Sequence, residues 1–225
     1  MANNTEHTYR VTFSELLVSS KDAFDSQLEQ FFEQDDELTF QVRMPSNEDS
    51  TPPGLLIYIS PKQGARMPEA WGAILDQHNL VWVGAENSGN EVHVARRVGL
   101  ALLAPSVAGT YGQFDLARVY LSGFSGGGRV ASMMIPSYPT LFSGAIFICG
   151  ANPVMVATEE TVAQIEHLPL VFLTGTGDFN LEDTQWSLQT YQQAGLSRAQ
   201  LMVIEGLDHA LPEASAIDDA LNALS

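Results

Sequence analysis

Near its middle the sequence reads Arg118-Val119-Tyr120-Leu121-Ser122-Gly123-Phe124-Ser125-Gly126-Gly127, and apolar residues at helical spacing follow as far as Ile135. An apolar strand that passes directly into a helix needs a sharp turn, and glycines two positions on either side of Ser125 let the two elements approach closely. The hydroxyl of Ser125 would then project from the carboxyl end of the strand, beside the free N–H groups that begin a helix. We expect Pro136 to stop the helix.

Strand patterns and helix patterns alternate on both sides of this stretch. Residues 38–44 alternate apolar and polar, and residues 55–59 form a continuous apolar run, typical of a strand covered on both faces. Similar patterns predict strands at 80–84, 118–122, 145–149, 168–173 and 201–204, and helices at 68–79, 92–103, 126–135, 186–194 and 214–224. This alternation predicts an α/β fold in one domain over residues 1–225, with a mostly parallel central sheet flanked by helices on both faces.

A serine hydroxyl becomes a useful nucleophile only when a base removes its proton. Histidine is the usual base, and two histidines, His167 and His209, follow Ser125 in the chain. His167 precedes the strand at 168–173 and so belongs at the amino end of the sheet, whereas ligands bind at the carboxyl ends of parallel strands. His209 follows the strand at 201–204 and belongs at the carboxyl edge. We therefore predict His209 as the base.

The acid that orients the base should follow the preceding strand, and Asp178 ends the turn Thr174-Gly175-Thr176-Gly177-Asp178. Asp183 is the second candidate in the same loop. Asp208 adjoins His209, and sequence neighbours seldom have the geometry to orient a ring nitrogen. The order Ser125, Asp178, His209 matches that of a hydrolase triad on this kind of sheet. For Asp178 the alternative is a turn aspartate without a catalytic role. For the turn at Ser125 the alternative is a glycine-rich turn that binds phosphate, although the Gly-Lys-Ser/Thr ending of a phosphate loop is absent.

Residues 115–129, which contain the Gly-x-Ser-x-Gly motif, resemble the nucleophile segment of esterases grouped with polyhydroxybutyrate depolymerases and feruloyl esterases. The likeness continues at 80–87, 141–145, 149–150, 175–178 and 208–209. It implies the α/β-hydrolase fold, with Ser125 as nucleophile, Asp178 as acid and His209 as base. It leaves the substrate open.

One segment departs from that resemblance. The family usually has His-Gly after the strand that corresponds to 55–59, and the next residue donates a backbone N–H to the oxyanion. This chain has Ser60-Pro61-Lys62 there, and proline has no N–H. By position, Gly126 would supply the first oxyanion N–H and Lys62 the second.

The leading prediction is a serine hydrolase that cleaves small or exposed carboxylic esters through an acyl-enzyme. A thioesterase, acyltransferase or peptidase would use the same three residues, and a non-catalytic binding member of the fold is the alternative of another class. Residues 151–167 leave little room for a lid domain, so we expect an open site.

The composition limits which kinds of partner this chain can bind. A formal net charge of -17 disfavours nucleic acid and anionic lipid. The single cysteine, Cys149, lies in an apolar run and is expected to be a buried residue on a strand. No metal spacing and no cofactor motif is present, and a homodimer stays open. A polar N-terminus without a signal pattern, and no apolar run long enough to span a bilayer, predict a cytoplasmic protein without membrane insertion.

Overall fold

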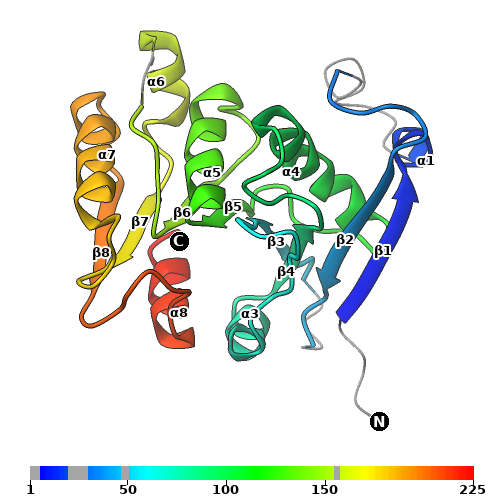
Figure 1. Ribbon diagram of the computed structural model, residues 1–225, viewed down its shortest axis with the longest axis horizontal. Coiled ribbons are helices and arrows are strands. Elements are labelled where there is room, and N and C mark those ends of the chain that lie inside the picture. The colour runs from blue at the N-terminus through cyan, green and yellow to red at the C-terminus, as the bar shows by residue number, and fades with distance from the viewer. Residues whose placement is uncertain (1–5, 20–29, 47–50, 155–157) are drawn as a thin grey trace.

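The computed structural model of the chain describes residues 6–19, 30–46, 51–154 and 158–225. The described strands are β1 (Glu6–Thr12), β2 (Glu37–Arg43), β3 (Gly54–Ile59), β4 (Leu80–Ala85), β5 (Val119–Phe124), β6 (Gly144–Ile148), β7 (Leu170–Gly175) and β8 (Ala199–Ile204). They form one sheet in the order β1-β2-β4-β3-β5-β6-β7-β8 (Figure 1). β1 and β2 pair antiparallel with each other, β2 pairs antiparallel with β4, and the remaining pairs are parallel.

Helices cover both faces of the sheet (Figure 1). They are α1 (Phe13–Ser19), the short η1 (Glu69–Trp71), α3 (Gly72–Gln77), α4 (Val94–Gly109), α5 (Gly126–Ser137), α6 (Glu159–Ile165), α7 (Leu181–Gln193) and α8 (Ala214–Asn222). α1, α4, α5 and α7 pack on one face, and η1, α3 and α8 pack on the other. The predicted α/β architecture is confirmed.

The side chains of the central strands alternate between two hydrophobic cores. In β3, Leu55, Ile57 and Ile59 pack on the side of α4 and α5, while Leu56 and Tyr58 pack on the side of α3 and α8. Every residue of β3 is buried, as a strand covered on both faces requires. The loops at the carboxyl ends of the parallel strands are therefore carried by a rigid layer.

The predicted end of the helix after Ser125 was wrong. Pro136 does not stop α5, which continues to Ser137. A proline inside a helix cannot donate to the carbonyl four residues earlier, here that of Ser132. The hydroxyl of Tyr191, on α7, donates to this carbonyl instead, at 2.7 Å. The tertiary contact satisfies the group that Pro136 leaves without a partner.

The other predicted elements differ from the structure mainly at their ends. α4 begins at Val94, because the ring of His93 accepts a hydrogen bond from the N–H of Ala95 and caps the helix. β1, α1 and α6 had no predicted counterpart. β1 is the edge strand, and its pattern of exposed and half-buried residues gives a weak apolar signal. Within the described residues, no helix is long and apolar enough to cross a bilayer.

Asp76, on α3, ties that helix to the end of β2. Its carboxylate pairs with Arg43 at 2.8 Å and accepts from the N–H of Ser46 at 2.8 Å. Burial by itself would raise the pKa of Asp76, but the hydrogen bonds from Ser46 and the contact with Arg43 outweigh burial and lower the pKa. A carboxylate with a lowered folded-state pKa stabilises the fold above its ordinary pKa, and this contribution disappears as the pH falls through the folded-state value.

We therefore expect Asp76→Asn to lower the free energy of unfolding at pH 7 by about 1–3 kcal/mol. Urea unfolding of the wild type and the variant between pH 7 and pH 3 would measure this. The difference between the two proteins should shrink below pH 4. A difference that stays constant over this range would contradict the assigned role of the charge.

Candidate active site

Ser125 lies at a tight turn between β5 and α5. Its backbone φ is 54° and ψ is -119°, a strained conformation for a residue with a side chain. Close packing explains the flanking glycines. A Cβ on Gly123 would lie 2.7 Å from the N of Gly128, and one on Gly127 would collide with the carbonyl of Ile59. The sequence thus forces the serine hydroxyl out at the carboxyl edge of the sheet.

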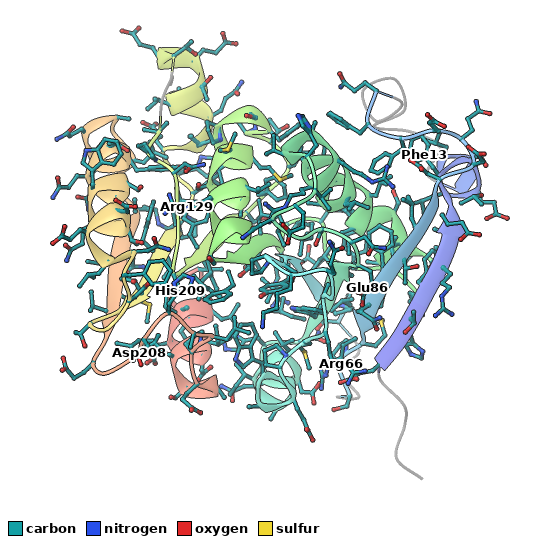
Figure 2. All side chains as sticks on the ribbon, viewed as in Figure 1. Phe13, Arg66, Glu86, Arg129, Asp208 and His209 are labelled. Atoms are coloured by element: carbon teal, nitrogen blue, oxygen red, sulfur yellow. The ribbon has the colours of Figure 1, made fainter. Side chains whose placement is uncertain are left out.

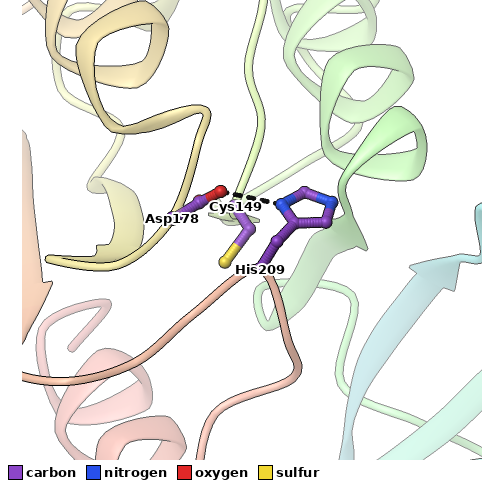
Figure 3. Close-up of side chains that lie close together, drawn as sticks. All are labelled: Cys149, Asp178 and His209. Carbon is purple, nitrogen blue, oxygen red and sulfur yellow. Dashed lines mark hydrogen bonds and ion pairs between the residues drawn. The ribbon is translucent and has the colours of Figure 1, made fainter.

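The structure brings together the three side chains that the sequence predicted for the triad. His209 follows β8, and its Nε2 lies 2.9 Å from Ser125 Oγ. Its Nδ1 lies 2.8 Å from Asp178 Oδ1, in the loop after β7 (Figure 3). Ser125, His209 and Asp178 therefore form one continuous chain of hydrogen bonds. This geometry allows His209 to take a proton from Ser125 while Asp178 holds the ring.

Asp178 is held in a fixed orientation by its neighbours. Its side chain is fully buried, with an exposed fraction of 0%. The Thr174 hydroxyl donates to Oδ2 at 2.7 Å, and the N–H of Asn180 donates to Oδ1 at 3.0 Å. Burial alone would raise the pKa of Asp178. The hydrogen bonds from Asn180, Thr174 and His209 outweigh burial and lower the pKa, so the carboxylate stays ionised at neutral pH.

Among the described residues, neither alternative acid is hydrogen-bonded to His209. Asp183 pairs with Arg129 of α5 at 3.3 Å. Asp208 is exposed, and its backbone carbonyl accepts from the N–H of Ala210 at 2.7 Å. Figure 2 labels Arg129, Asp208 and His209 and shows the histidine on the loop after β8. Of the three acids considered, Asp178 is the one hydrogen-bonded to His209.

Two aromatic rings flank the imidazole of His209. The ring of Phe179 lies 4.1 Å from it between centroids, and the ring of Phe124 lies 5.0 Å from it. Phe179 is 76% exposed, so it shields the histidine from one side at the protein surface. Aromatic faces attract cations, and this packing would stabilise an imidazolium as well as fix the ring plane. No sequence pattern predicted this role for either phenylalanine.

Cys149 lies behind the triad. It was predicted on a strand, but β6 ends at Ile148, and Cys149 adopts a φ of 52° just beyond it. Its sulfur, a carboxylate oxygen of Asp178 and a ring nitrogen of His209 lie within 4.8 Å of one another (Figure 3). Burial raises the pKa of the Cys149 thiol, and the Asp178 charge adds to the effect. A metal ligand must be a thiolate, so the arrangement favours a neutral thiol packed against the triad.

The two predicted oxyanion donors have different surroundings. Gly126 is the first residue of α5, and its N–H has no acceptor within the helix. The N–H of Lys62 donates to the hydroxyl of Ser60 at 3.0 Å. That hydroxyl in turn donates to the carbonyl of Gly64 at 2.7 Å, which closes the loop after β3 on itself. The structure therefore directs the Lys62 N–H into its own loop.

A buried arginine, which the sequence did not single out, joins the two loops beside Ser125. Arg97, on α4, donates from Nε to the carbonyl of Ser88 at 2.6 Å and from a terminal nitrogen to the carbonyl of Ser60 at 3.0 Å. The residue is 6% exposed, and burial lowers the pKa of its guanidinium. Arg97 thus fixes the loop after β3 against the loop after β4.

A cavity of about 480 Å³ opens beside the triad. His209, Phe124, Lys62, Arg66 and Tyr58 are among the residues that line it. The segment between β6 and β7 contains the seven-residue helix α6 and adds no separate domain over the site in the described part. The cavity has room for a small ligand next to Ser125.

Comparisons with known proteins identify the fold. No family model matches the sequence, and no curated protein matches it either. Among solved structures, a ferulic acid esterase superposes with a TM-score of 0.65 at 15% identity, over 96% of this chain and 95% of that one. A thermostable esterase gives 0.64 at 16%, over 97% of this chain and 60% of that one. An α/β-hydrolase enzyme from the metagenome of Lake Arreo gives 0.63 at 12%, over 97% and 81%.

At these identities the likeness concerns the fold, and it agrees with the strand order and the strand-to-helix turn described above. This chain spans 60% of the length of the thermostable esterase, so that protein contains additional segments. The chain has the α/β-hydrolase fold.

Proposed function

We propose that this chain is a serine hydrolase that cleaves small carboxylic esters, with Ser125 as nucleophile, His209 as general base and Asp178 as the acid that orients it. The observation that carries the proposal is the continuous hydrogen-bond chain among these residues, with distances of 2.9 Å and 2.8 Å. The names of the similar structures, a ferulic acid esterase and a thermostable esterase, agree with it.

The reaction would proceed through an acyl-enzyme. His209 Nε2 takes the proton of Ser125 while Oγ bonds to the ester carbonyl carbon. The carbonyl electron pair moves onto oxygen and forms a tetrahedral oxyanion. When the pair returns, the bond to the alcohol oxygen breaks, and His209 gives its proton to that oxygen. Water then repeats the sequence on the acyl-enzyme and releases the carboxylic acid and Ser125.

Asp178 contributes by holding the ring of His209 and by stabilising the imidazolium that forms. The lowered pKa of Asp178 keeps this carboxylate charged, so its negative charge offsets the positive ring. The Phe179 and Phe124 rings restrict the imidazole plane further.

The size of the cavity supports small substrates. A volume of about 480 Å³ holds a small ester, and the charged side chains of Lys62 and Arg66 line the cavity together with Phe124 and Leu211. We therefore expect p-nitrophenyl acetate and butyrate to be hydrolysed faster than the octanoate and decanoate, as measured by kcat/KM from p-nitrophenolate release. A steady rise in kcat/KM up to decanoate would contradict the proposed small-ester preference.

The same series separates ester hydrolysis from the alternatives. Turnover of a thioester or peptide in the absence of any ester turnover would move the activity to another acyl-transfer reaction. Absence of turnover for all of these substrates, with no labelling of Ser125 by a fluorophosphonate probe, would favour a binding role.

A further inference from the structure

The loop after β3 lacks an available second donor for the oxyanion among its first three residues. Pro61 has no N–H. The Lys62 N–H donates a hydrogen bond to Ser60 Oγ at 3.0 Å, and the Ser60 hydroxyl donates one to the carbonyl of Gly64 at 2.7 Å. Of the two predicted donors, the N–H of Gly126 alone is then left for a charge that similar reactions stabilise with two or more donors.

The side chain of Asn90 lies against Gly126, the residue whose N–H would be the first oxyanion donor. Asn90 belongs to the loop after β4, yet its amide packs directly against Gly126 at the start of α5. A Cβ built on Gly126 would lie 2.8 Å from Asn90 Cγ and 3.0 Å from Nδ2, and closer still to Oδ1. This glycine therefore leaves the space that the Asn90 amide occupies. The amide is adjacent to the residue whose N–H is the first donor.

The backbone of Asn90 is fixed to the loop after β3. Its N–H donates to the carbonyl of Pro61 at 3.0 Å, and the N–H of Asn87 donates to the carbonyl of Gln63 at 2.6 Å. Arg97 donates hydrogen bonds to the carbonyls of Ser88 and Ser60. The backbone that carries the Asn90 side chain is therefore fixed beside Gly126, which limits the positions that its amide can reach.

The side-chain amide itself is uncommitted. Asn90 is exposed, and the described residues offer its Oδ1 and Nδ2 no hydrogen-bond partner. Rotation about the Cβ–Cγ bond interchanges the two ends of the amide, and an anionic oxygen selects the NH₂ end. A substrate that enters beside Ser125 would therefore meet a donor that no protein group occupies.

We propose that the Asn90 side chain is a catalytic residue that donates Nδ2–H to the oxyanion, together with the backbone N–H of Gly126. The inference rests on the proposed ester hydrolysis. As Ser125 Oγ bonds to the carbonyl carbon, the carbonyl electron pair moves onto oxygen, the serine proton goes to His209, and Gly126 and Asn90 hydrogen-bond the new anion. Asn90 itself gains and loses no proton.

Two substitutions of Asn90 test this assignment. Asn90→Ala removes the donor, and we expect kcat for p-nitrophenyl acetate to fall about 10²–10³-fold with KM nearly unchanged. Asn90→Asp keeps the shape but replaces the NH₂ group with a charged oxygen, so kcat should fall at least as far. Asn87→Asp is the matched control in the same loop. Asn87 is exposed and has a φ of 55°, which aspartate tolerates, and kcat should stay within about threefold.

A transition-state analogue gives a second readout that a merely structural role would not move. The affinity of a trifluoromethyl ketone, which forms the same oxyanion on Ser125, should fall in Asn90→Ala by a factor similar to kcat. Competitive inhibition by the product acid should change little. Circular dichroism would show that each variant is folded, and the near-isosteric Asn90→Asp serves if the alanine variant is not.

The outcomes separate the two proposals. A wild type that hydrolyses esters, with Asn90→Ala or Asn90→Asp within threefold of its kcat, would overturn the role of Asn90 and leave the esterase intact. An equal loss of trifluoromethyl ketone and product-acid affinity would also overturn it. A wild type that hydrolyses no ester would overturn the proposed function, and the oxyanion role would fall with it.

Discussion

Ser125→Ala is expected to lower kcat for p-nitrophenyl acetate on the order of 10⁶-fold, because without Oγ no acyl-enzyme can form and only the binding contributions remain. The hydroxyl of Ser125 is the group that lies 2.9 Å from His209 Nε2 at the strained turn after β5. Rates would be measured by p-nitrophenolate release after subtraction of the uncatalysed rate.

Ser137→Ala is the matched control for this prediction. Ser137 is an exposed residue at the end of the same helix, and its hydroxyl donates to the carbonyl of Met133 at 2.9 Å. Its loss should leave kcat within twofold of the wild type. Hydrolysis that persists at more than a tenth of the wild-type rate in Ser125→Ala would mean that another group attacks the ester.

Asp178→Asn is expected to lower kcat about 10⁴-fold. The amide is nearly isosteric with the carboxylate, but it lacks the charge that stabilises the imidazolium. If its NH₂ end faces His209, it also imposes the wrong ring tautomer. The Asp178 carboxylate is buried and accepts hydrogen bonds from Thr174 and Asn180. Water therefore cannot reach the site to replace the lost charge.

Asp183→Asn provides the comparison that separates the two acids of this loop. Asp183 pairs with Arg129 at the surface, with a side chain that is 64% exposed, and exposed pairs of this kind contribute little to stability. The kcat of Asp183→Asn should therefore stay within threefold of the wild-type value. If Asp183→Asn lost more activity than Asp178→Asn, the acid would have been assigned to the wrong residue.

The sheet and the three candidate residues Ser125, Asp178 and His209 could be predicted from the sequence because their positions follow from local patterns. Strands buried on both faces are continuous apolar runs, and the tight turn at Ser125 requires glycines at fixed positions. His209 and Asp178 could be chosen because the carboxyl ends of parallel strands meet at one edge. Formation of the predicted sheet is therefore enough to bring these side chains close together.

Other parts of the site depend on contacts that no local pattern records. Asn90 is separated from Gly126 by α4 and β5, and Arg97 acts through the carbonyls of two loops. The prediction for Lys62 followed from its position in the chain. Its direction of hydrogen bonding depends on the hydroxyl of Ser60, two residues away. These features follow from loop conformations, which apolar periodicity does not encode.

The predicted ends of helices and strands were wrong where tertiary contacts override local sequence preferences. α5 passes through Pro136 because Tyr191, on another helix, satisfies the carbonyl that proline cannot reach. β1 is an edge strand whose inward residues are only half-buried and include the polar His7, so its apolar alternation is faint. Cys149 was correctly predicted as buried, but its position beyond β6 brings it against Asp178 and His209 rather than into the sheet.

Treatment of the protein with a fluorophosphonate, followed by mass spectrometry of the digested chain, would show which residue is the activated nucleophile. We expect one equivalent of probe, bound to the peptide that contains Ser125, with labelling strongly slowed in His209→Ala and absent in Ser125→Ala. An adduct on another residue, or none at all in folded wild-type protein, would contradict the central claim that Ser125 is an activated nucleophile.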